Sequence, residues 1–581
     1  MKKILLTLVL VPFFLSSCVI IEMIMMSADD YTNFGEGIDF KKKQSIIADY
    51  KIFAKVKLSD DEFFFIGKDD EIFQFFTYSI SQNKLSDVKE HQCIENENLE
   101  EIEFINGKVR LFTNVYSEDD KAFSVIKREI NPSTLEVLSS ELYFTSELES
   151  DSDLPEYIKS SKNSFYNYGD LKSDFEDYDG NKKRFIISKD HKYSIVVFPI
   201  IERGSLFYGC RIQNIETGKF ADGKFEVTNR QDNDGRFANL DTENIFINFK
   251  LLHVELNTNG DAYITTSEYI EDKHENVLSV FQIKFGGGIE KYDLKLPTEF
   301  VEEEKKEEDE EERFVCYDAR IKIYGDELVI VGGVTDYIEN YYARKWGWTS
   351  KLYSIFNTNF NIKTKAFSEI KSYELTKENV KSITDYRKIR FSLINDFERK
   401  EKGELIVFIE DLDLKKGVSG SSLNRAGDDW GDRYPDEVTW WYEATDSFIF
   451  SFDNNLNLNW SYEIDRKLDL SPMLYKDNEY NNYGPDVSSE YFSAFTLDNA
   501  IVKVIYAKQK GNLTGYVDLG RSINQVEVDT KTGKKINESI LFKHVMINIY
   551  ETSPILEGTD NQYLFFLPSS EGQKLTVIEK K

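Results

Sequence analysis

The chain has few cysteine and histidine residues. Its 581 residues include four Cys and five His. Beyond Cys18 only Cys93, Cys210 and Cys316 remain, and because this number is odd a disulfide framework is not expected. Apolar or aromatic neighbours predict that these three are buried free thiols. The histidines stand apart without metal-ligand spacing, so neither a metal site nor any other cofactor is predicted from them.

Positive charge is also scarce. The chain carries 72 Lys and Arg against 103 Asp and Glu, for a formal net charge of -31. Nucleic-acid binding depends on Lys and Arg that neutralise phosphates, so nucleic acid is excluded as a partner. The same charge predicts repulsion from an anionic lipid surface. Cations, neutral glycans and the basic face of a protein remain as partners.

Helical periodicity is missing over any long segment, and only 10 residues are proline. Aromatic residues are abundant instead, with 33 Tyr and 43 Phe, and these favour strands. A short apolar strand recurs, and several copies follow a polar turn such as Asn106-Gly107 or Lys402-Gly403. The eight predicted core strands are Phe63 to Ile66, Val109 to Thr113, Ile195 to Phe198, Ala262 to Thr265, Leu328 to Val331, Leu405 to Ile409, Ile501 to Tyr506 and Tyr563 to Leu567.

The spacing of these strands favours a propeller. Successive core strands begin roughly 45 to 95 residues apart, close to or above the usual blade period of ~40 to 50 residues. The sequence therefore predicts an all-β protein, a β-propeller of seven to eight blades, with two β-sandwich domains as the alternative. Ile46 to Val56 is expected to complete the last blade by pairing with Leu575 to Ile578. The predicted organisation is a signal peptide at 1–17, a tether at 18–43 and the propeller at 44–581.

The N-terminus predicts where the protein is located. Lys2 and Lys3 precede an apolar run that begins at Ile4 and ends in Leu15-Ser16-Ser17-Cys18. This stretch resembles the signal peptides of bacterial lipoproteins, in which small residues precede a cysteine. The resemblance implies that Cys18 becomes the first mature residue, carries acyl chains such as palmitate, and anchors the protein in the cell envelope, in the periplasm or on the surface. Because the apolar run continues to Met26, an uncleaved membrane anchor over residues 4–26 is the alternative.

Two turns carry a second resemblance. Ile215-Glu216-Thr217-Gly218-Lys219 and Val528-Asp529-Thr530-Lys531-Thr532-Gly533-Lys534 are similar to the Asp-x-x-Thr-Gly-Lys turns of pyrroloquinoline-quinone-type propeller repeats. Phe452 to Trp460 resembles a diverged copy that keeps the following tryptophan. Such repeats also build lipid-anchored scaffold proteins of outer-membrane barrel assembly. The resemblance implies the fold and does not imply a quinone cofactor.

Five of the six Trp residues fall in two insertions, one in the fifth unit and one in the sixth. Gly347, Gly427 and Gly431 predict that these insertions are loops. Planar rings beside Arg and carboxylates suit sugar rings and equally suit protein hot spots, whereas the alternative is that they fill gaps between blades. The predicted ligand-binding residues are Tyr341, Tyr342, Trp346, Trp348, Trp430, Trp440 and Trp441.

Other motifs predict less. Asp174, Asp177, Asp179 and Asn181, and likewise Asp232 to Gly235, are rich in oxygen ligands but lack the full spacing of a calcium loop, so solvated turns are expected and calcium is the alternative. No serine lies in a nucleophile elbow, and no other catalytic motif is present.

Together these features predict a lipid-anchored extracytoplasmic protein that binds a protein or a glycan through aromatic-rich loops, without catalysis. The alternatives are a propeller carbohydrate-active enzyme, whose carboxylate pair would be invisible in sequence, and a scaffold in outer-membrane assembly.

Overall fold

The computed structural model describes most of the chain between residues 40 and 580. The described ranges are 40–48, 52–69, 71–94, 97–117, 122–147, 185–202, 205–228, 249–270, 275–297, 314–336, 352–384, 389, 391–400, 402–418, 438–473, 492–497, 500–509, 521–544, 556–557, 562–569 and 572–580. The chain forms two compact units. Unit 1 comprises Met1–Gln92, Glu490–Val528 and Lys535–Lys581, and unit 2 comprises Cys93–Ser489 and Asp529–Lys534.

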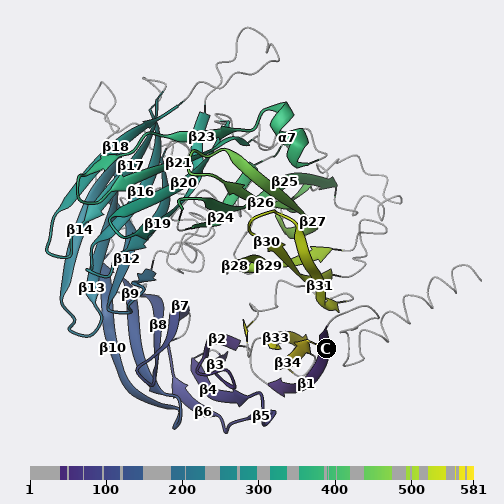
Figure 1. Ribbon diagram of the computed structural model, residues 1–581. Coiled ribbons are helices and arrows are strands. Elements are labelled where there is room, and N and C mark those ends of the chain that lie inside the picture. Colours follow the sequence, from purple (N-terminus) through teal and green to yellow (C-terminus); the bar gives the residue numbers. More distant parts are fainter. Residues whose placement is uncertain are drawn as a thin grey trace, which may run out of the picture. The chain divides into compact units, whose positions relative to one another are not determined.

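The described strands form eight antiparallel sheets, which are the blades of an all-β propeller (Figure 1). We number the sheets in chain order. Unit 2 contains sheets 2 to 6. Their strands are β7 (Asn98–Ile105), β8 (Lys108–Ser117), β9 (Ala122–Asn131) and β10 (Glu136–Glu147) in sheet 2; β11 (Phe185–Ile187), β12 (Tyr193–Glu202), β13 (Ser205–Asn214) and β14 (Phe220–Thr228) in sheet 3; β15 (Phe249–Leu256), β16 (Ala262–Ile270), β17 (Glu275–Ile283) and β18 (Ile289–Leu296) in sheet 4; β19 (Phe314–Tyr324), β20 (Glu327–Asp336), β21 (Leu352–Asn361), β22 (Ala366–Phe367) and β23 (Lys371–Glu374) in sheet 5; and β24 (Phe391–Arg399), β25 (Leu405–Val418), β26 (Val438–Phe452) and β27 (Leu458–Met473) in sheet 6.

Unit 1 contains the other three sheets. Their strands are β2 (Ile52–Lys57), β3 (Glu62–Asp69), β4 (Ile72–Ser79), β5 (Lys84–Leu85) and β6 (Lys89–Gln92) in sheet 1; β28 (Phe492–Leu497), β29 (Ile501–Gln509), β30 (Arg521–Asp529) and β31 (Lys535–His544) in sheet 7, of which the last residue of β30 is assigned to unit 2; and β32 (Leu556–Glu557), β33 (Gln562–Ser569), β34 (Gly572–Lys580) and β1 (Phe40–Ala48) in sheet 8.

Every predicted core strand is the second strand of a sheet, so the eight predicted repeats correspond to eight sheets. Second strands are buried on both faces, which is why they read as continuous apolar runs, as in Phe63, Phe64, Phe65 and Ile66 of β3. In unit 2 the buried side chains of sheets 3 and 4, of sheets 4 and 5, and of sheets 5 and 6 form shared clusters. Each fully buried Val, Leu, Ile or Phe contributes about 1.5–3 kcal/mol. Packing between neighbouring sheets therefore stabilises the unit.

The N-terminal strand completes sheet 8, but over fewer residues than expected. β1 pairs with β34, and Ile46 lies opposite Leu575. The predicted pairing segment was too long, because residues 52–57 form β2 and pair with β3 in sheet 1. The polar stretch Asp49-Tyr50-Lys51 separates two apolar runs, and each run enters a different sheet. β1 begins at Phe40, inside the range predicted as tether.

Four turns between third and fourth strands share one geometry. Each begins with Asn or Asp, whose side-chain Oδ1 accepts a hydrogen bond from the backbone N–H of the residue three positions later. In three of the four turns it also accepts one from the backbone N–H of the residue two positions later. The residue four positions later has a positive φ. The four first residues are Asn131, Asn214, Asn361 and Asp529. The turns predicted at 215–219 and 529–534 are thus confirmed, and two more of the same kind follow β9 and β21.

Among the described residues one helix is present, α7 (Lys377–Ile383), between β23 and β24. Thr376 caps it by accepting from the Asn379 N–H at 3.2 Å, and Val380 and Ile383 are buried against sheets 5 and 6. Within the described ranges we find no helix of the length and apolarity that a membrane crossing requires.

Candidate binding face

The two ends of each four-stranded sheet differ in their connections. In an antiparallel meander the first-to-second and third-to-fourth turns lie at one end, which we call the turn end. The second-to-third connection lies at the other, which we call the insertion end. In sheets 5 and 6 the insertion end holds residues 337–351, between β20 and β21, and 419–437, between β25 and β26. The two insertions therefore join equivalent strands of consecutive sheets.

The insertion ends of sheets 5 and 6 lie on the same side of unit 2. Asp318 of β19 accepts through Oδ2 from the backbone N–H of Ile394 of β24, at 2.7 Å. Further along, the Tyr324 hydroxyl of β19 donates to Glu398 Oε2 of β24, at 3.1 Å. Because residue numbers increase together along both contacts, β19 and β24 run in the same direction. Both strands start at the insertion end, so these two ends coincide.

Charged side chains also join sheet 5 to sheet 6 and sheet 4 to sheet 5. The Lys322 ammonium on β19 lies 2.8 Å from Asp396 Oδ1 and 2.6 Å from Glu398 Oε1 on β24. Burial alone would lower the pKa of Lys322, but these two carboxylates outweigh it and hold the pKa above its usual value. On β15, burial raises the pKa of the Glu255 carboxyl, and the positive charges of Lys189 and Lys322 offset only part of this effect. Charged side chains thus link sheets 4, 5 and 6.

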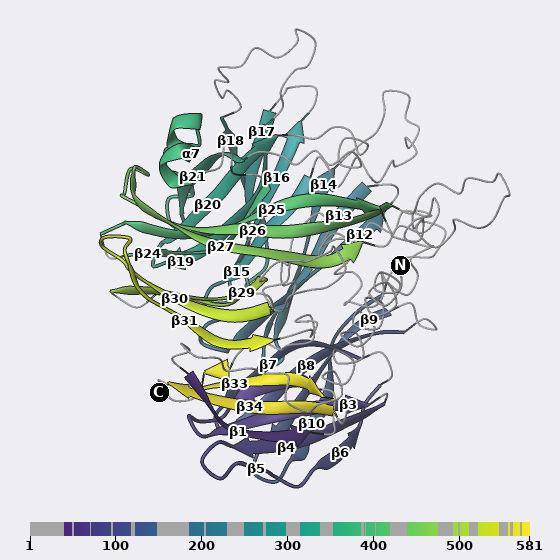
Figure 2. The ribbon, with the colours of Figure 1, turned by 90° about the vertical axis from the view of Figure 1, so that its right-hand side faces the viewer.

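Five of the seven predicted ligand-binding residues lie outside the described residues: Tyr341, Tyr342, Trp346, Trp348 and Trp430. For Trp440 and Trp441 the structure describes the backbone only. They belong to β26, opposite Lys416 and Lys415 of β25, and their placement in a loop was wrong. The run Val438-Thr439-Trp440-Trp441-Tyr442 consists of residues that favour strands, so the hairpin continues further than the flanking glycines indicated. Figure 2 shows β25, β26 and β27 running side by side.

A group of buried polar residues lies in the same sheet. Arg466 of β27 is fully buried and donates to the buried Glu410 of β25. Ser447 of β26 lies directly opposite Glu410 and is also fully buried, and its Oγ has no hydrogen-bond partner among the described residues. Asp411 and Asp446 are buried in the same part of the sheet. Removing one partner of such a buried pair leaves an uncompensated buried charge and is strongly destabilising.

Sequence reasoning missed this group. The adjacent carboxylates Glu410 and Asp411, which interrupt the apolar run of β25, were the available signal.

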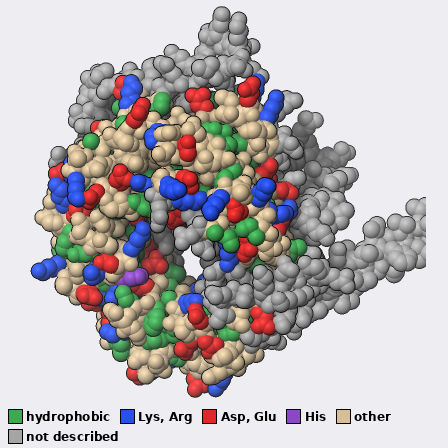
Figure 3. Space-filling model, in the orientation of Figure 1, with side chains coloured by type: hydrophobic (Ala, Val, Ile, Leu, Met, Phe, Trp, Pro, Cys, Tyr) green, Lys and Arg blue, Asp and Glu red, His purple; other side chains and the backbone are tan. Residues whose placement is uncertain are grey.

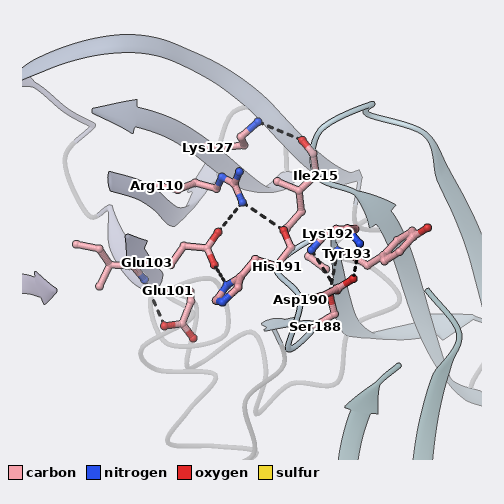
Figure 4. Close-up of polar contacts among 12 residues, drawn as sticks. Glu101, Glu103, Arg110, Lys127, Ser188, Asp190, His191, Lys192, Tyr193 and Ile215 are labelled. Atoms are coloured by element: carbon pink, nitrogen blue, oxygen red, sulfur yellow. Dashed lines mark hydrogen bonds and ion pairs between the residues drawn. The ribbon is translucent and has the colours of Figure 1, made fainter. Parts of the chain in front are cut away.

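A second polar cluster joins the turn ends of sheets 2 and 3 (Figure 4). Glu103 of β7 binds two partners: Arg110 Nη1 of β8 lies 2.6 Å from its Oε1, and His191 Nδ1 lies 2.5 Å from its Oε2. His191 belongs to the turn between β11 and β12 and has a φ of 58°. Glu103 and Arg110 are buried, whereas the His191 side chain is 46% exposed.

The same cluster reaches a second turn. Lys127 of β9 donates to the Ile215 carbonyl at 3.3 Å and pairs with Glu141 at 2.8 Å. All of these groups bind protein partners in neighbouring strands and turns, so the arrangement connects sheets 2 and 3.

The prediction that Cys93, Cys210 and Cys316 are buried and form no disulfide with one another is confirmed. Burial raises the pKa of Cys210 to about 12, so this thiol is inert at neutral pH. Cys18 and the acidic turns at 174–181 and 232–235 lie outside the described residues. Within the described ranges no group of three or more His, Cys, Asp or Glu has metal-binding geometry.

Comparison with known proteins gives no family. No family model matches the chain. No curated protein matches it either. Solved structures similar to the chain include the WD40 domain of SCAP from fission yeast (10% identity, 93% of this chain and 98% of that chain, TM-score 0.32), the Dos1 propeller (9%, 93% and 96%, 0.33) and the polysaccharide lyase Uly1 (9%, 91% and 100%, 0.32). Similarity at this level carries no argument about function, and the fold assignment depends on the strand pairing above.

Proposed function

We propose that this chain is a lipid-anchored extracytoplasmic protein that binds a protein or a glycan at the insertion ends of sheets 5 and 6. The observation that carries the proposal is positional. The two insertions hold three of the six Trp residues, and two more lie near the start of β26. The insertions join the second and third strands of consecutive sheets, and the insertion ends of those sheets coincide. Side chains from both insertions can therefore contribute to one site.

The composition of the insertions supports a binding role. Besides the aromatic residues they contain Arg344, Asp428, Asp429 and Asp432. Aromatic faces stack on sugar rings or anchor protein hot spots, and the charged groups supply directional hydrogen bonds to hydroxyls or to a basic partner. The sheets below are held by the β19–β24 contacts and by the Glu410–Arg466 pair, so the insertions are attached to a rigid support.

The sixth tryptophan provides an internal control. Trp460 of β27 donates through Nε1 to the Thr530 carbonyl at 3.2 Å, so it is a structural residue. The experiment compares the wild type, Trp346→Ala with Trp441→Ala, and Trp460→Phe in two assays. One assay measures binding to a glycan array and recovery of cross-linked partners from cell envelopes, and the other measures Tm.

The proposal predicts that the double variant loses binding with an almost unchanged Tm, whereas Trp460→Phe keeps binding and lowers the Tm. Exposed aromatic anchors typically contribute ~2 kcal/mol or more to binding. A large loss of stability in the double variant would show that these residues are core filler.

The lipid anchor needs its own test. Intact mass spectrometry of the purified protein should give a mature chain that starts at Cys18 and carries acyl groups, and Cys18→Ala should leave an unacylated, uncleaved precursor. A wild-type chain that still contains Met1 would contradict the lipoprotein assignment.

A further inference from the structure

Three buried polar side chains of sheets 4 and 5 each have an atom without a hydrogen-bond partner in the part of the chain that the structure describes. The atoms are Asn276 Nδ2 of β17, Thr335 Oγ1 of β20 and Ser354 Oγ of β21. Each of these residues is at most 1% exposed. Ser267 Oγ donates to Asn276 Oδ1 at 3.0 Å, so the amide Nδ2 is the group of Asn276 that still needs a partner.

All three residues lie close to the insertion end of their strands. Asn276 is the second residue of β17, Ser354 is the third residue of β21, and Thr335 is the next-to-last residue of β20. Residues 337–351 join β20 to β21, so Thr335 and Ser354 flank one of the two aromatic-rich insertions. The unpartnered atoms therefore border the binding face of the proposed function.

Sheets 4 and 5 have their insertion ends on the same side of unit 2. Lys365, in the turn after β21, donates to Oε1 of Gln282, the next-to-last residue of β17. Both residues lie at the turn ends of their sheets. The two turn ends therefore coincide, and so do the two insertion ends.

The alternation of side chains along a strand gives the direction of Asn276 and Ser354. Leu278 and Phe356 belong to the buried cluster that sheets 4 and 5 share, and they lie two positions after Asn276 and Ser354 respectively. Side chains two positions apart in a strand point to the same face. Asn276 and Ser354 therefore both point into the interface between sheets 4 and 5.

Thr335 points to the other face of sheet 5. It lies opposite Leu352, which belongs to the buried cluster shared by sheets 5 and 6. Sheet 5 thus has unpartnered hydroxyl groups on both of its faces, at the same end.

Buried polar atoms of this kind need a partner. A buried hydroxyl or amide without a hydrogen bond lowers the folding equilibrium constant about five- to hundredfold, and native proteins contain few of them. Three such atoms at the same end of two neighbouring sheets therefore carry a large cost. A bound molecule that supplies both donors and acceptors would offset it.

We propose that Asn276, Thr335 and Ser354 bind the hydroxyl groups of a neutral glycan at the insertion ends of sheets 4 and 5. The proposal rests on the proposed function and narrows its ligand from a protein or a glycan to a glycan. A hydroxyl group both donates and accepts, so a sugar can pair with the Asn276 amide donor and with either hydroxyl. The aromatic rings of residues 337–351 would stack on the faces of the same sugar.

The neutral character of these groups favours a neutral ligand over a charged protein surface. All three unpartnered atoms belong to uncharged side chains. The charged side chains that join sheets 5 and 6 bind one another, as Lys322 binds Asp396 and Glu398. On the face shown in Figure 3 acidic and basic side chains are interspersed, so no field of one sign marks this face for a charged partner.

The test uses the purified full chain on an array of neutral oligosaccharides and of oligosaccharides that carry uronic acid or sulfate groups. We expect binding to neutral oligosaccharides. Thr335→Val and Ser354→Ala each remove one unpartnered hydroxyl with little change in shape. Each variant should lower the affinity for the bound oligosaccharide about fivefold and should raise the Tm of the protein without glycan.

Matched control variants remove hydroxyl groups that have partners. Thr358 Oγ1 donates to the Ser368 carbonyl at 3.2 Å, and Ser279 Oγ donates to Asp293 Oδ1 at 2.6 Å. Thr358 and Ser279 are buried in the same two sheets. Thr358→Val and Ser279→Ala should lower the Tm and leave the affinity for the oligosaccharide unchanged.

A lower Tm of Thr335→Val and Ser354→Ala without glycan would overturn the proposal, because it would show that ordered water or the chain itself already pairs with these hydroxyls. Unchanged affinity of both variants would also overturn it, and so would a wild type that binds a protein partner and no neutral oligosaccharide. The proposed function would survive these results if Trp346→Ala with Trp441→Ala still abolished binding. A double tryptophan variant that kept its glycan affinity would contradict the proposed function alone.

Discussion

The indole ring of Trp460 covers Gly533 so closely that a Cβ atom at Gly533 would lie 2.6 Å from the ring. Trp460 also donates to the Thr530 carbonyl of the same turn, at 3.2 Å. Gly533 has a φ of +67°, a conformation that other residues rarely adopt. The tryptophan and the glycine therefore constrain each other.

Gly533→Ala is expected to destabilise the protein more than Gly218→Ala. Gly218 occupies the same position of an equivalent turn, with a φ of +69°, but nothing lies within 4 Å of the position of a Cβ. Gly218→Ala should cost only the backbone strain, about 1–2 kcal/mol. Gly533→Ala adds a clash with Trp460. Urea denaturation measures the difference, and equal losses would contradict the docking of Trp460.

Asp529 should make the 529–534 turn sensitive to acid. Hydrogen bonds from the hydroxyl and the backbone N–H of Thr532 hold the pKa of this carboxyl below its usual value. A lowered pKa in the folded state gives stability that is present above the unfolded-state value of about 4 and is lost as the pH falls through the folded-state value. Asn occupies the same position in three equivalent turns, so Asp529→Asn should keep the turn and lose this part of the acid sensitivity.

Asp529→Ala is the contrasting variant, because it removes the acceptor and should lower the Tm at neutral pH. Thermal unfolding at pH 3 and pH 7 distinguishes the variants. An Asn variant with the same pH dependence as the wild type would disprove the role of the carboxylate.

Glu255 should make the stability of the protein depend on pH in the opposite direction from Asp529. Burial raises the pKa of its carboxyl, so the folded protein retains a proton at pH values where the unfolded chain has lost it. Stability from this group is present below the unfolded-state value of about 4.3 and falls as the pH rises through the folded-state value. Glu255→Gln should therefore gain stability relative to the wild type as the pH rises from 4 to 7. Parallel stability curves for the two proteins would rule out this assignment.

Glu103 and Arg110, which belong to neighbouring strands of sheet 2, should be strongly coupled in their effects on stability. Both groups are buried, and Arg110 also lies 3.5 Å from the His191 carbonyl. Removing one member of a buried pair leaves an uncompensated charge and typically costs about 3–5 kcal/mol. We expect Arg110→Met to cost that much and the double variant with Glu103→Gln to cost less than the sum. Additive losses in the double-mutant cycle would mean that the two residues act independently.

The features of the fold that could be predicted were those that depend on short local sequence patterns. The core strand from Phe63 to Ile66 and the turn at Asn106-Gly107 each follow from a few adjacent residues. The interactions of the buried polar residues could not be predicted in this way, because the partners are distant in sequence. Arg466 binds Glu410 across 56 positions, and His191 binds Glu103 across 88. Such contacts depend on strand register and on which sheets are neighbours.

The candidate site was predictable only in part. The position of the insertions between second and third strands followed from the repeat, whereas Trp440 and Trp441 proved to be strand residues. Glycines nearby favoured a loop, but the β-forming side chains between Val438 and Tyr442 determined the local structure.

The central claim is that the tryptophans of the two insertions and of the adjoining start of β26 are presented for binding, and fluorescence quenching tests it most directly. In a Trp460→Phe background the tryptophans left in the chain are the three of the two insertions and the two near the start of β26. We predict red-shifted emission and efficient quenching by acrylamide, as solvent-accessible indoles give, with protection when a ligand is bound. Blue-shifted emission that acrylamide barely quenches would show that the rings are buried between sheets and would contradict the proposed binding face.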